Sequence, residues 1–153
     1  MPKYDVTDEA IINASPAVVY RALIDEMDGK TDWWYPHHIT KLRSGISFGQ
    51  VGAIHDTAIR IHGSLSTHFA ARTAEVKENE MIRLEYIEGS LLGECIWRFE
   101  EVDGKTKLSY RWMVSTAGFW RSLFAHMLPY AGSHSKTMEK GYKQLNEYLE
   151  QRS

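Results

Sequence analysis

Hydrophobic and polar residues alternate over most of residues 39–114, and this period of two is typical of β-strands. A first strand is predicted over 4–13, and six more are predicted at 39–44, 50–61, 67–77, 81–88, 93–101 and 106–114. Asp103-Gly104, between the last two strands, is a strong hairpin signal because both residues tolerate a positive φ. The sequence therefore predicts an antiparallel meander of seven strands.

The last three strands alternate cleanly enough to assign their two faces. One face is apolar and aromatic and comprises Ile82, Leu84, Tyr86, Cys95, Trp97, Phe99, Leu108, Tyr110, Trp112 and Val114. The other face carries mainly charged residues that water can reach. An aromatic row of this size must be covered, and the predicted cover is a helix over 133–150. The apolar stripe of that helix consists of Met138, Tyr142, Leu145 and Leu149.

Ser15 and Pro16 predict where the first helix begins. Ser15 can offer its side-chain oxygen to free helix N–H groups, and Pro16 suits the first helical position. This helix is expected to run to about Met27, with charged side chains such as Glu26 pointing to water. A second, short helical turn is predicted around Trp34 before the next proline stops it.

The chain has 153 residues, the size of one domain, and we expect residues 1–153 to form a single α+β domain. Its formal net charge of -2 offers no basic field, so nucleic acid is not an expected partner. Cys95 is the only cysteine, and residues 1–5 lack an apolar signal core, so a cytoplasmic protein is expected. No apolar run approaches the roughly 18 residues that span a bilayer, and we expect no stable membrane insertion.

The order of these elements resembles the START/Bet v 1-like (SRPBCC) helix-grip superfamily, in particular its bacterial polyketide cyclase/dehydrase-like branch. The resemblance is carried by the long closing helix, by Trp33-Trp34, and by Ala14-Ser15-Pro16-Ala17-Val18-Val19-Tyr20 after the first strand. It implies a seven-stranded curved antiparallel sheet wrapped around a long C-terminal helix, two short helices between strands 1 and 2, and an apolar cavity. The superfamily includes lipid carriers, cyclases, quinone-binding proteins and chaperone activators, and a fold alone does not choose among them.

His55 is the candidate catalytic residue, because the pKa of an imidazole lies close to the working range of a general base. His55 and Asp56 are neighbours on a strand, so only one of them can reach the cavity. The simpler interpretation of His55 is a surface or hydrogen-bonded strand residue. Tyr86, Tyr110 and Tyr142 could donate hydrogen bonds to a substrate carbonyl, or they are core aromatics whose hydroxyls find one partner.

No metal and no cofactor are expected. The histidines at 37, 38, 55, 62 and 68 do not follow a zinc-ligand spacing. Nucleophilic catalysis is not indicated either, because Cys95 lies in an apolar strand, where burial should raise the pKa of its thiol.

Residues 118–130 are apolar almost all round and include Phe119 and Phe124. We interpret this segment as a helical lid over the cavity. Contact with a membrane surface and a homodimer contact through Phe119, Trp120 and Phe124 are the alternatives.

We therefore expect a protein that binds or transports a hydrophobic or aromatic small molecule, such as a lipid, quinone or polyketide-like compound, between the sheet and the closing helix. The predicted ligand-binding residues are Trp34, Tyr86, Trp97, Tyr110, Trp112, Phe119, Phe124, Met138 and Tyr142. One alternative is a cyclase or dehydratase that uses His55 as base and tyrosine hydroxyls as hydrogen-bond donors. A second is a chaperone-activator-like interaction protein with a filled interior. Cavity volume separates it from the others, because ligand pockets typically hold about 300 Å³ or more.

Overall fold

The computed structural model describes residues 3–35, 38–43, 45–62, 65–89, 91–116 and 130–152. Its elements are β1 (Lys3–Ile12), α1 (Pro16–Met27), β2 (His38–Leu42), β3 (Ile54–His62), β4 (Leu65–Lys77), β5 (Met81–Gly89), β6 (Leu91–Val102), β7 (Lys105–Thr116) and α3 (Tyr130–Glu150). The strands form one antiparallel sheet in the order β1-β7-β6-β5-β4-β3-β2. All seven predicted strands and the closing helix are present, and the predicted lid over 118–130 lies almost wholly outside the described residues.

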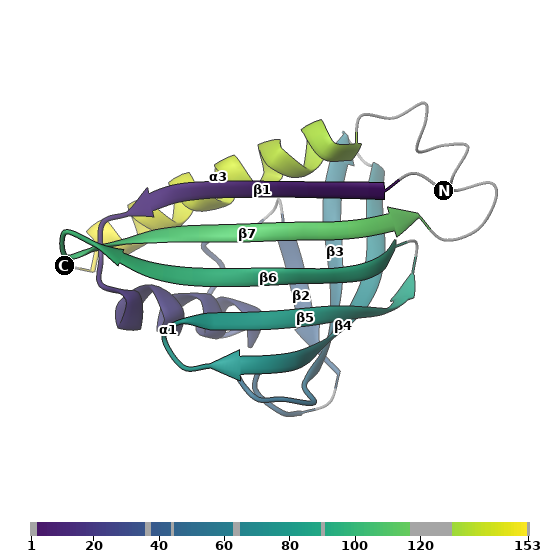
Figure 1. Cartoon of the computed structure of the whole chain (residues 1–153), viewed down its shortest axis with the longest axis horizontal. Coiled ribbons are helices and arrows are strands. Elements are labelled where there is room, and N and C mark those ends of the chain that lie inside the picture. The colour runs from purple at the N-terminus through teal and green to yellow at the C-terminus, as the bar shows by residue number, and fades with distance from the viewer. Residues whose placement is uncertain are drawn as a thin grey trace.

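The sheet is strongly curved. In Figure 1, β1, β7, β6 and β5 run side by side across the view, whereas β2 and β3 run crosswise behind them. The strand between these two groups, β4, shifts register with β5 between Ala70 and Ala71 and again between Thr73 and Glu75. Such irregularities bend a strand and increase its local twist, so β4 is where the sheet curls.

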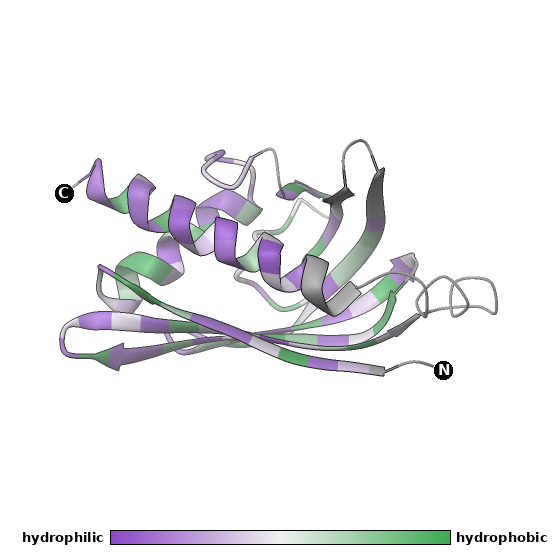
Figure 2. Ribbon diagram, turned by 90° about the horizontal axis from the view of Figure 1, so that it is seen from above, coloured by the Kyte–Doolittle hydropathy of each residue, from purple (hydrophilic) through white to green (hydrophobic). Residues whose placement is uncertain are grey.

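α3 lies across the concave side of this sheet (Figure 2). The predicted stripe faces the core, since Met138, Tyr142 and Leu145 are buried and Leu149 packs against the core while partly exposed. The helix begins at Tyr130, three residues before the predicted start. Sheet and helix therefore bury one another's apolar faces, as the pattern predicted.

Side chains of α3 also protect the edge of the sheet at β1. The hydroxyl of Tyr142 donates a hydrogen bond to the carbonyl of Asp8 at 2.7 Å, and the side-chain amide of Asn146 donates to the carbonyl of Ile11 at 3.1 Å. The backbone N–H of Asn13 donates in turn to the side-chain oxygen of Asn146. Edge backbone groups are a template for unwanted pairing, and these contacts occupy part of that edge.

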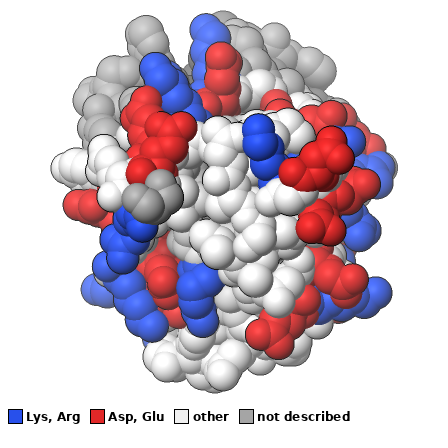
Figure 3. Space-filling view, turned by 90° about the vertical axis from the view of Figure 1, so that its left-hand side faces the viewer, with Lys and Arg blue, Asp and Glu red and all other residues white. Residues whose placement is uncertain are grey.

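The two faces assigned from the sequence are confirmed. The ten residues predicted to face inward on β5, β6 and β7 are all buried. On the outer face, Arg83 forms ion pairs with Glu75, Glu85 and Glu94. Side chains of both charges are also interspersed at the end of the molecule that carries the C-terminus (Figure 3). The hairpin signal holds as well, because Asp103 and the glycine after it have φ of 52° and 79°.

Three details near the first helix differ from the predictions. Ser15 makes no side-chain capping hydrogen bond, although Pro16 does occupy the first turn. The second short helix is a single turn over residues 33–35, in which the N–H of Tyr35 donates to the carbonyl of Asp32. Glu26, predicted to point to water, is only 5 % exposed.

The carboxylate of Glu26 explains both the turn and its own burial. Its Oε1 accepts hydrogen bonds from the hydroxyl of Thr31 at 2.7 Å and the N–H of Trp33 at 3.1 Å, and its Oε2 accepts from the N–H of Trp34 at 3.0 Å. The first N–H groups of a helical turn have no acceptor within the turn, and the Glu26 carboxylate supplies one. Glu26 thus holds the two stacked indoles, whose ring centres lie 5.6 Å apart, against the core.

Gly141 is the point where α3 passes closest to this turn. A Cβ atom at residue 141 would lie 2.5 Å from two atoms of the Trp34 indole, well inside van der Waals contact. We therefore expect Gly141→Ala to lower the free energy of unfolding by about 2 kcal/mol, because overpacking a core outweighs the better helix propensity of alanine. Urea unfolding measures this. Lys140→Ala, on the exposed side of the same turn, is the control, and equal stability of both variants would contradict the contact.

Neither of the two described helices is long and apolar enough to cross a membrane.

Candidate binding site

A small cavity lies between the concave face of the sheet, the Trp34 turn and the first two turns of α3. Its volume is about 30 Å³. The described residues that line it are Met27, Trp34, His38, His55, Thr57, Phe69, Ala71, Leu84, Tyr86, Cys95, Trp97, Tyr110, His134, Thr137 and Met138. The cavity lies between the sheet and α3, as the sequence predicted. Its volume is about a tenth of the roughly 300 Å³ expected of a ligand pocket. Large aromatic side chains from the sheet and from the Trp34 turn fill most of the interior.

The structure brings together most of the predicted site residues. His55 lines the cavity with five of the predicted ligand-binding residues, which are Trp34, Tyr86, Trp97, Tyr110 and Met138. Trp112 and Tyr142 are buried nearby but do not line it. Phe119 and Phe124 lie outside the described residues. Six of the predicted site residues therefore line one cavity, and whether they bind a ligand is a proposal taken up below.

His55 and His38 are buried, neutral imidazoles. His55 is 3 % exposed, and its neighbour Asp56 lies on the outer face, as the alternation required. Loss of solvation lowers the pKa of His55 to about 4, although Asp56 and Asp28 partly oppose this. Burial, with smaller effects of two nearby histidines, lowers the pKa of His38 to about 3. A base this weak abstracts protons poorly near neutral pH, which disfavours His55 as the base of an enzyme.

His134 is the third buried histidine of the cavity. Its ring stacks on Trp112, with ring centres 4.1 Å apart and planes within 8°. Its Nδ1 lies 3.2 Å from Oδ2 of Asp8, but the geometry of this contact is not that of a hydrogen bond. Asp8 also lines an open groove of about 400 Å³ between β1 and α3, so the pair lies between that groove and the cavity.

Two tyrosine hydroxyls meet on the sheet side of the cavity. The indole N–H of Trp112 donates to the hydroxyl of Tyr86 at 2.9 Å, and the hydroxyls of Tyr86 and Tyr110 lie 3.5 Å apart. Burial raises the pKa of both phenols well above the ordinary value, so they keep their protons. Burial also raises the pKa of the Cys95 thiol to about 12, as the sequence predicted, and an unreactive thiol results.

Sequence reasoning missed His38 and His134. A signal for His134 was present, because it precedes Met138 by one helical turn and therefore continues the apolar stripe of α3. His38 was treated only as a poor zinc ligand beside His37. Its burial follows from its pairing opposite Ile59 on β3, which no local pattern reports. Among the described residues, no group of three His, Cys, Asp or Glu side chains could hold a metal ion.

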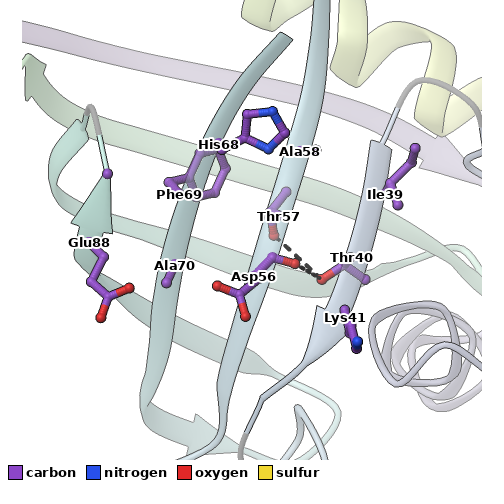
Figure 4. A pocket seen from close by; sticks show the side chains of 11 residues that line it. Ile39, Thr40, Lys41, Asp56, Thr57, Ala58, His68, Phe69, Ala70 and Glu88 are labelled. Carbon is purple, nitrogen blue, oxygen red and sulfur yellow. Dashed lines mark hydrogen bonds between the residues drawn. The ribbon is translucent and has the colours of Figure 1, made fainter.

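A larger hollow of about 390 Å³ opens on the outer face of the sheet. Figure 4 shows Asp56, Ala70 and Glu88 side by side on β3, β4 and β5, with Ala58 and His68 further along the strands. Its charged groups already have partners, because Arg43 bonds to both Asp56 and Glu88. The charged groups of the hollow are therefore paired with one another, and the hollow is open to solvent. The buried cavity is the stronger candidate site.

Neither a scan of protein-family models nor a search of curated protein sequences finds a match. Solved structures do match. The Zhui aromatase/cyclase from Streptomyces sp. R1128 is 12 % identical, with a TM-score of 0.76 over 99 % of this chain and 96 % of that chain. TTHA0849 from Thermus thermophilus is 15 % identical, with a TM-score of 0.74 over 98 % of this chain and 99 % of that chain.

A third match is major latex-like protein 151 from Panax ginseng, 10 % identical, with a TM-score of 0.69 over 95 % of this chain and 97 % of that chain. This chain has the helix-grip fold, a curled seven-stranded antiparallel sheet with a C-terminal helix. Sequence identities this low establish the fold and leave the activity open. The fold predicted from the element order is thereby confirmed, with one helix and a turn where two short helices were expected between β1 and β2.

Proposed function

We propose that this helix-grip protein binds a hydrophobic or aromatic small molecule, such as a lipid, quinone or polyketide-like compound, between the sheet and α3. The observation that carries the proposal is a cavity whose walls are aromatic while three of its buried polar atoms lack partners among the described residues. These atoms are Nδ1 of His38, Nδ1 of His55 and Nε1 of Trp97. Nδ1 of His134, which also lines the cavity, makes no hydrogen bond to a described residue either, but it lies 3.2 Å from Oδ2 of Asp8. A core selected only for stability would bury apolar groups there, since each unpaired polar atom costs about 1–3 kcal/mol.

The cavity is too small for an organic ligand unless its walls move apart. About 30 Å³ is room for one or two water molecules, whereas ligand pockets typically hold about 300 Å³ or more. The described walls must therefore separate when a ligand enters. The interaction-protein alternative rests on a filled interior and on residues 119–128. The small volume agrees with a filled interior and so with this alternative, but residues 119–128 lie outside the described part of the chain. The unpartnered polar atoms favour ligand binding, because a filled core gives them no hydrogen-bond partner.

Two neighbouring alanines allow a matched test. Ala71 lines the cavity, whereas Ala70 lies on the outer face, in the hollow of Figure 4. We expect the wild-type chain to bind the neutral fluorophore 1-aminoanthracene and Ala71→Leu to bind it at least about tenfold more weakly, because the added side chain fills the cavity. Ala70→Leu is expected to bind as the wild type does. Fluorescence titration gives the affinities, and native mass spectrometry of freshly purified protein reports any retained cargo.

Two other outcomes of these measurements would contradict the proposal in different ways. Loss of binding in Ala70→Leu alone would move the site to the outer hollow. No fluorophore bound by the wild type, together with a bare-chain mass, would refute ligand binding in the interior. Thermal unfolding of both variants checks that each remains folded at the temperature of the titration.

A further inference from the structure

The unpartnered polar atoms of the cavity also restrict which chemical groups can bind there. His38 Nδ1, His55 Nδ1 and Trp97 Nε1 are buried and have no hydrogen-bond partner among the described residues. They come from β2, β3 and β6, yet all three side chains line the same cavity. Buried polar groups are nearly always paired in folded proteins, so three such atoms around one cavity indicate an occupant that forms hydrogen bonds.

Trp97 determines which kind of hydrogen bond the occupant must make. An indole N–H can only donate, so its partner has to be an acceptor. The two histidines add no such restriction, because Nδ1 of a neutral imidazole either donates or accepts according to the tautomer. A hydroxyl oxygen, which donates one hydrogen bond and accepts two, can satisfy all three groups, and a carbonyl oxygen can accept from Trp97 and from one histidine.

The charge of the lining restricts the occupant further. None of the described residues that line the cavity is Lys, Arg, Asp or Glu, and the third lining histidine, His134, already faces the carboxylate of Asp8 at 3.2 Å. Burial keeps His38 and His55 neutral, with pKa values of about 3 and about 4. A carboxylate or an ammonium group would lose its hydration there without gaining an opposite charge, which is strongly unfavourable.

The size of the cavity also fits an uncharged oxygen atom. About 30 Å³ is room for one or two water molecules, and so for one or two polar oxygen atoms. The part of the site that is already formed is therefore its polar end. Aromatic rings of a ligand would lie against Trp34, Tyr110 and Met138, which line the same cavity.

We infer that the interior site selects ligands that carry an uncharged oxygen acceptor on an aromatic ring, namely a ketone, quinone or phenol, over carboxylates and over plain hydrocarbons. The acceptor oxygen receives the hydrogen bond of Trp97 and lies beside His38 and His55. This inference rests on the proposed function and narrows it, because it excludes fatty acids and other anionic lipids as preferred ligands.

Three probes of nearly equal shape test the inference on the full chain at neutral pH. They are 2-acetonaphthone, which carries a neutral ketone, 2-naphthoate, which carries a carboxylate, and 2-isopropenylnaphthalene, in which a carbon replaces the oxygen. We expect the ketone to bind at least about tenfold more tightly than either of the others, the effect of one net hydrogen bond. NMR of ¹⁵N-labelled protein should show the indole N–H signal of Trp97 moving downfield with the ketone only.

Trp97→Phe separates hydrogen bonding from shape. We expect it to weaken ketone binding about tenfold and to change hydrocarbon binding by less than about twofold. Trp33→Phe is the matched control, because Trp33 donates its indole N–H to the carbonyl of Ala22 and does not line the cavity. The comparison of the three probes on the wild type does not depend on either variant remaining folded.

The possible results distinguish two failures. If none of the three probes binds, the proposed function is wrong and this inference is wrong with it. If the carboxylate or the hydrocarbon binds as tightly as the ketone, ligand binding stands and the selection of a neutral acceptor is refuted. Equal weakening of all three probes in Trp97→Phe would show that Trp97 acts only through its shape.

Discussion

Acidification from pH 7 to pH 4 is expected to remove about 3 kcal/mol of unfolding free energy for each of His38 and His55. In the unfolded chain both imidazoles bind protons near pH 6.5, whereas burial lowers their folded pKa values to about 3 and about 4. Between these limits the unfolded state binds more protons, so stability falls as the pH falls. The combined loss approaches the whole stability of a typical domain, about 5–15 kcal/mol, so we expect acid unfolding near pH 4.

Urea unfolding at several pH values between 7 and 4 measures this effect. His55→Gln removes one titrating group, so its stability should depend less on pH, by about 3 kcal/mol over the same range. His68→Gln, which replaces an exposed histidine on β4, is the control. A wild-type stability that stays constant down to pH 4 would mean that His38 and His55 are not buried as described.

Glu26→Ala is expected to lower the free energy of unfolding by about 4 kcal/mol. The substitution leaves the backbone N–H groups of Trp33 and Trp34 buried without their acceptor, and it frees the hydroxyl of Thr31. Glu26→Gln keeps one acceptor oxygen but places an NH₂ group against a donor, so an intermediate loss is expected. Urea unfolding gives the energies, and near-UV circular dichroism reports whether the stacked indole pair keeps its geometry.

Asp25→Ala is the matched control for this prediction. Asp25 is the preceding residue of α1 and forms a partly exposed i,i+4 ion pair with Arg21. Such a pair contributes little, so Asp25→Ala is expected to change stability by less than about 1 kcal/mol. A Glu26→Ala variant as stable as Asp25→Ala would contradict the role assigned to the buried carboxylate. Glu26→Ala should also weaken ligand binding, since Trp34 forms one wall of the cavity.

The strands and their faces were predictable because they depend on local periodicity. Trp97 and Trp112 share the apolar face of their strands with every second residue, while Arg98 and Arg111 beside them belong to the other face. This pattern assigns each tryptophan to the inner face without knowledge of the rest of the chain. The Asp103-Gly104 hairpin was predictable for the same reason, since two residues determine the turn. Five of the predicted ligand-binding residues therefore line the cavity.

Local patterns were less informative where a side chain finds its partner outside its own element. Glu26 occupies a position that a helical pattern assigns to water, and only the return of the chain at Trp33 and Trp34 supplies the N–H groups that bury it. Ser15 has the right chemistry for a cap, yet its side chain makes no such hydrogen bond. A local pattern shows which residue types are present, but it does not show which groups from distant parts of the chain will contact them.

The amino-acid sequence by itself determined the order of elements, the aromatic inner face and the helix that covers it, because each follows from the spacing of residues within one element. Only the tertiary structure decided how much space remains and which polar groups surround it. His38, His55 and His134 are far apart in the chain and meet through the pairing of β2 with β3 and the position of α3. A volume of about 30 Å³ is the small difference between large side-chain volumes contributed by several elements, and no single element contains that information.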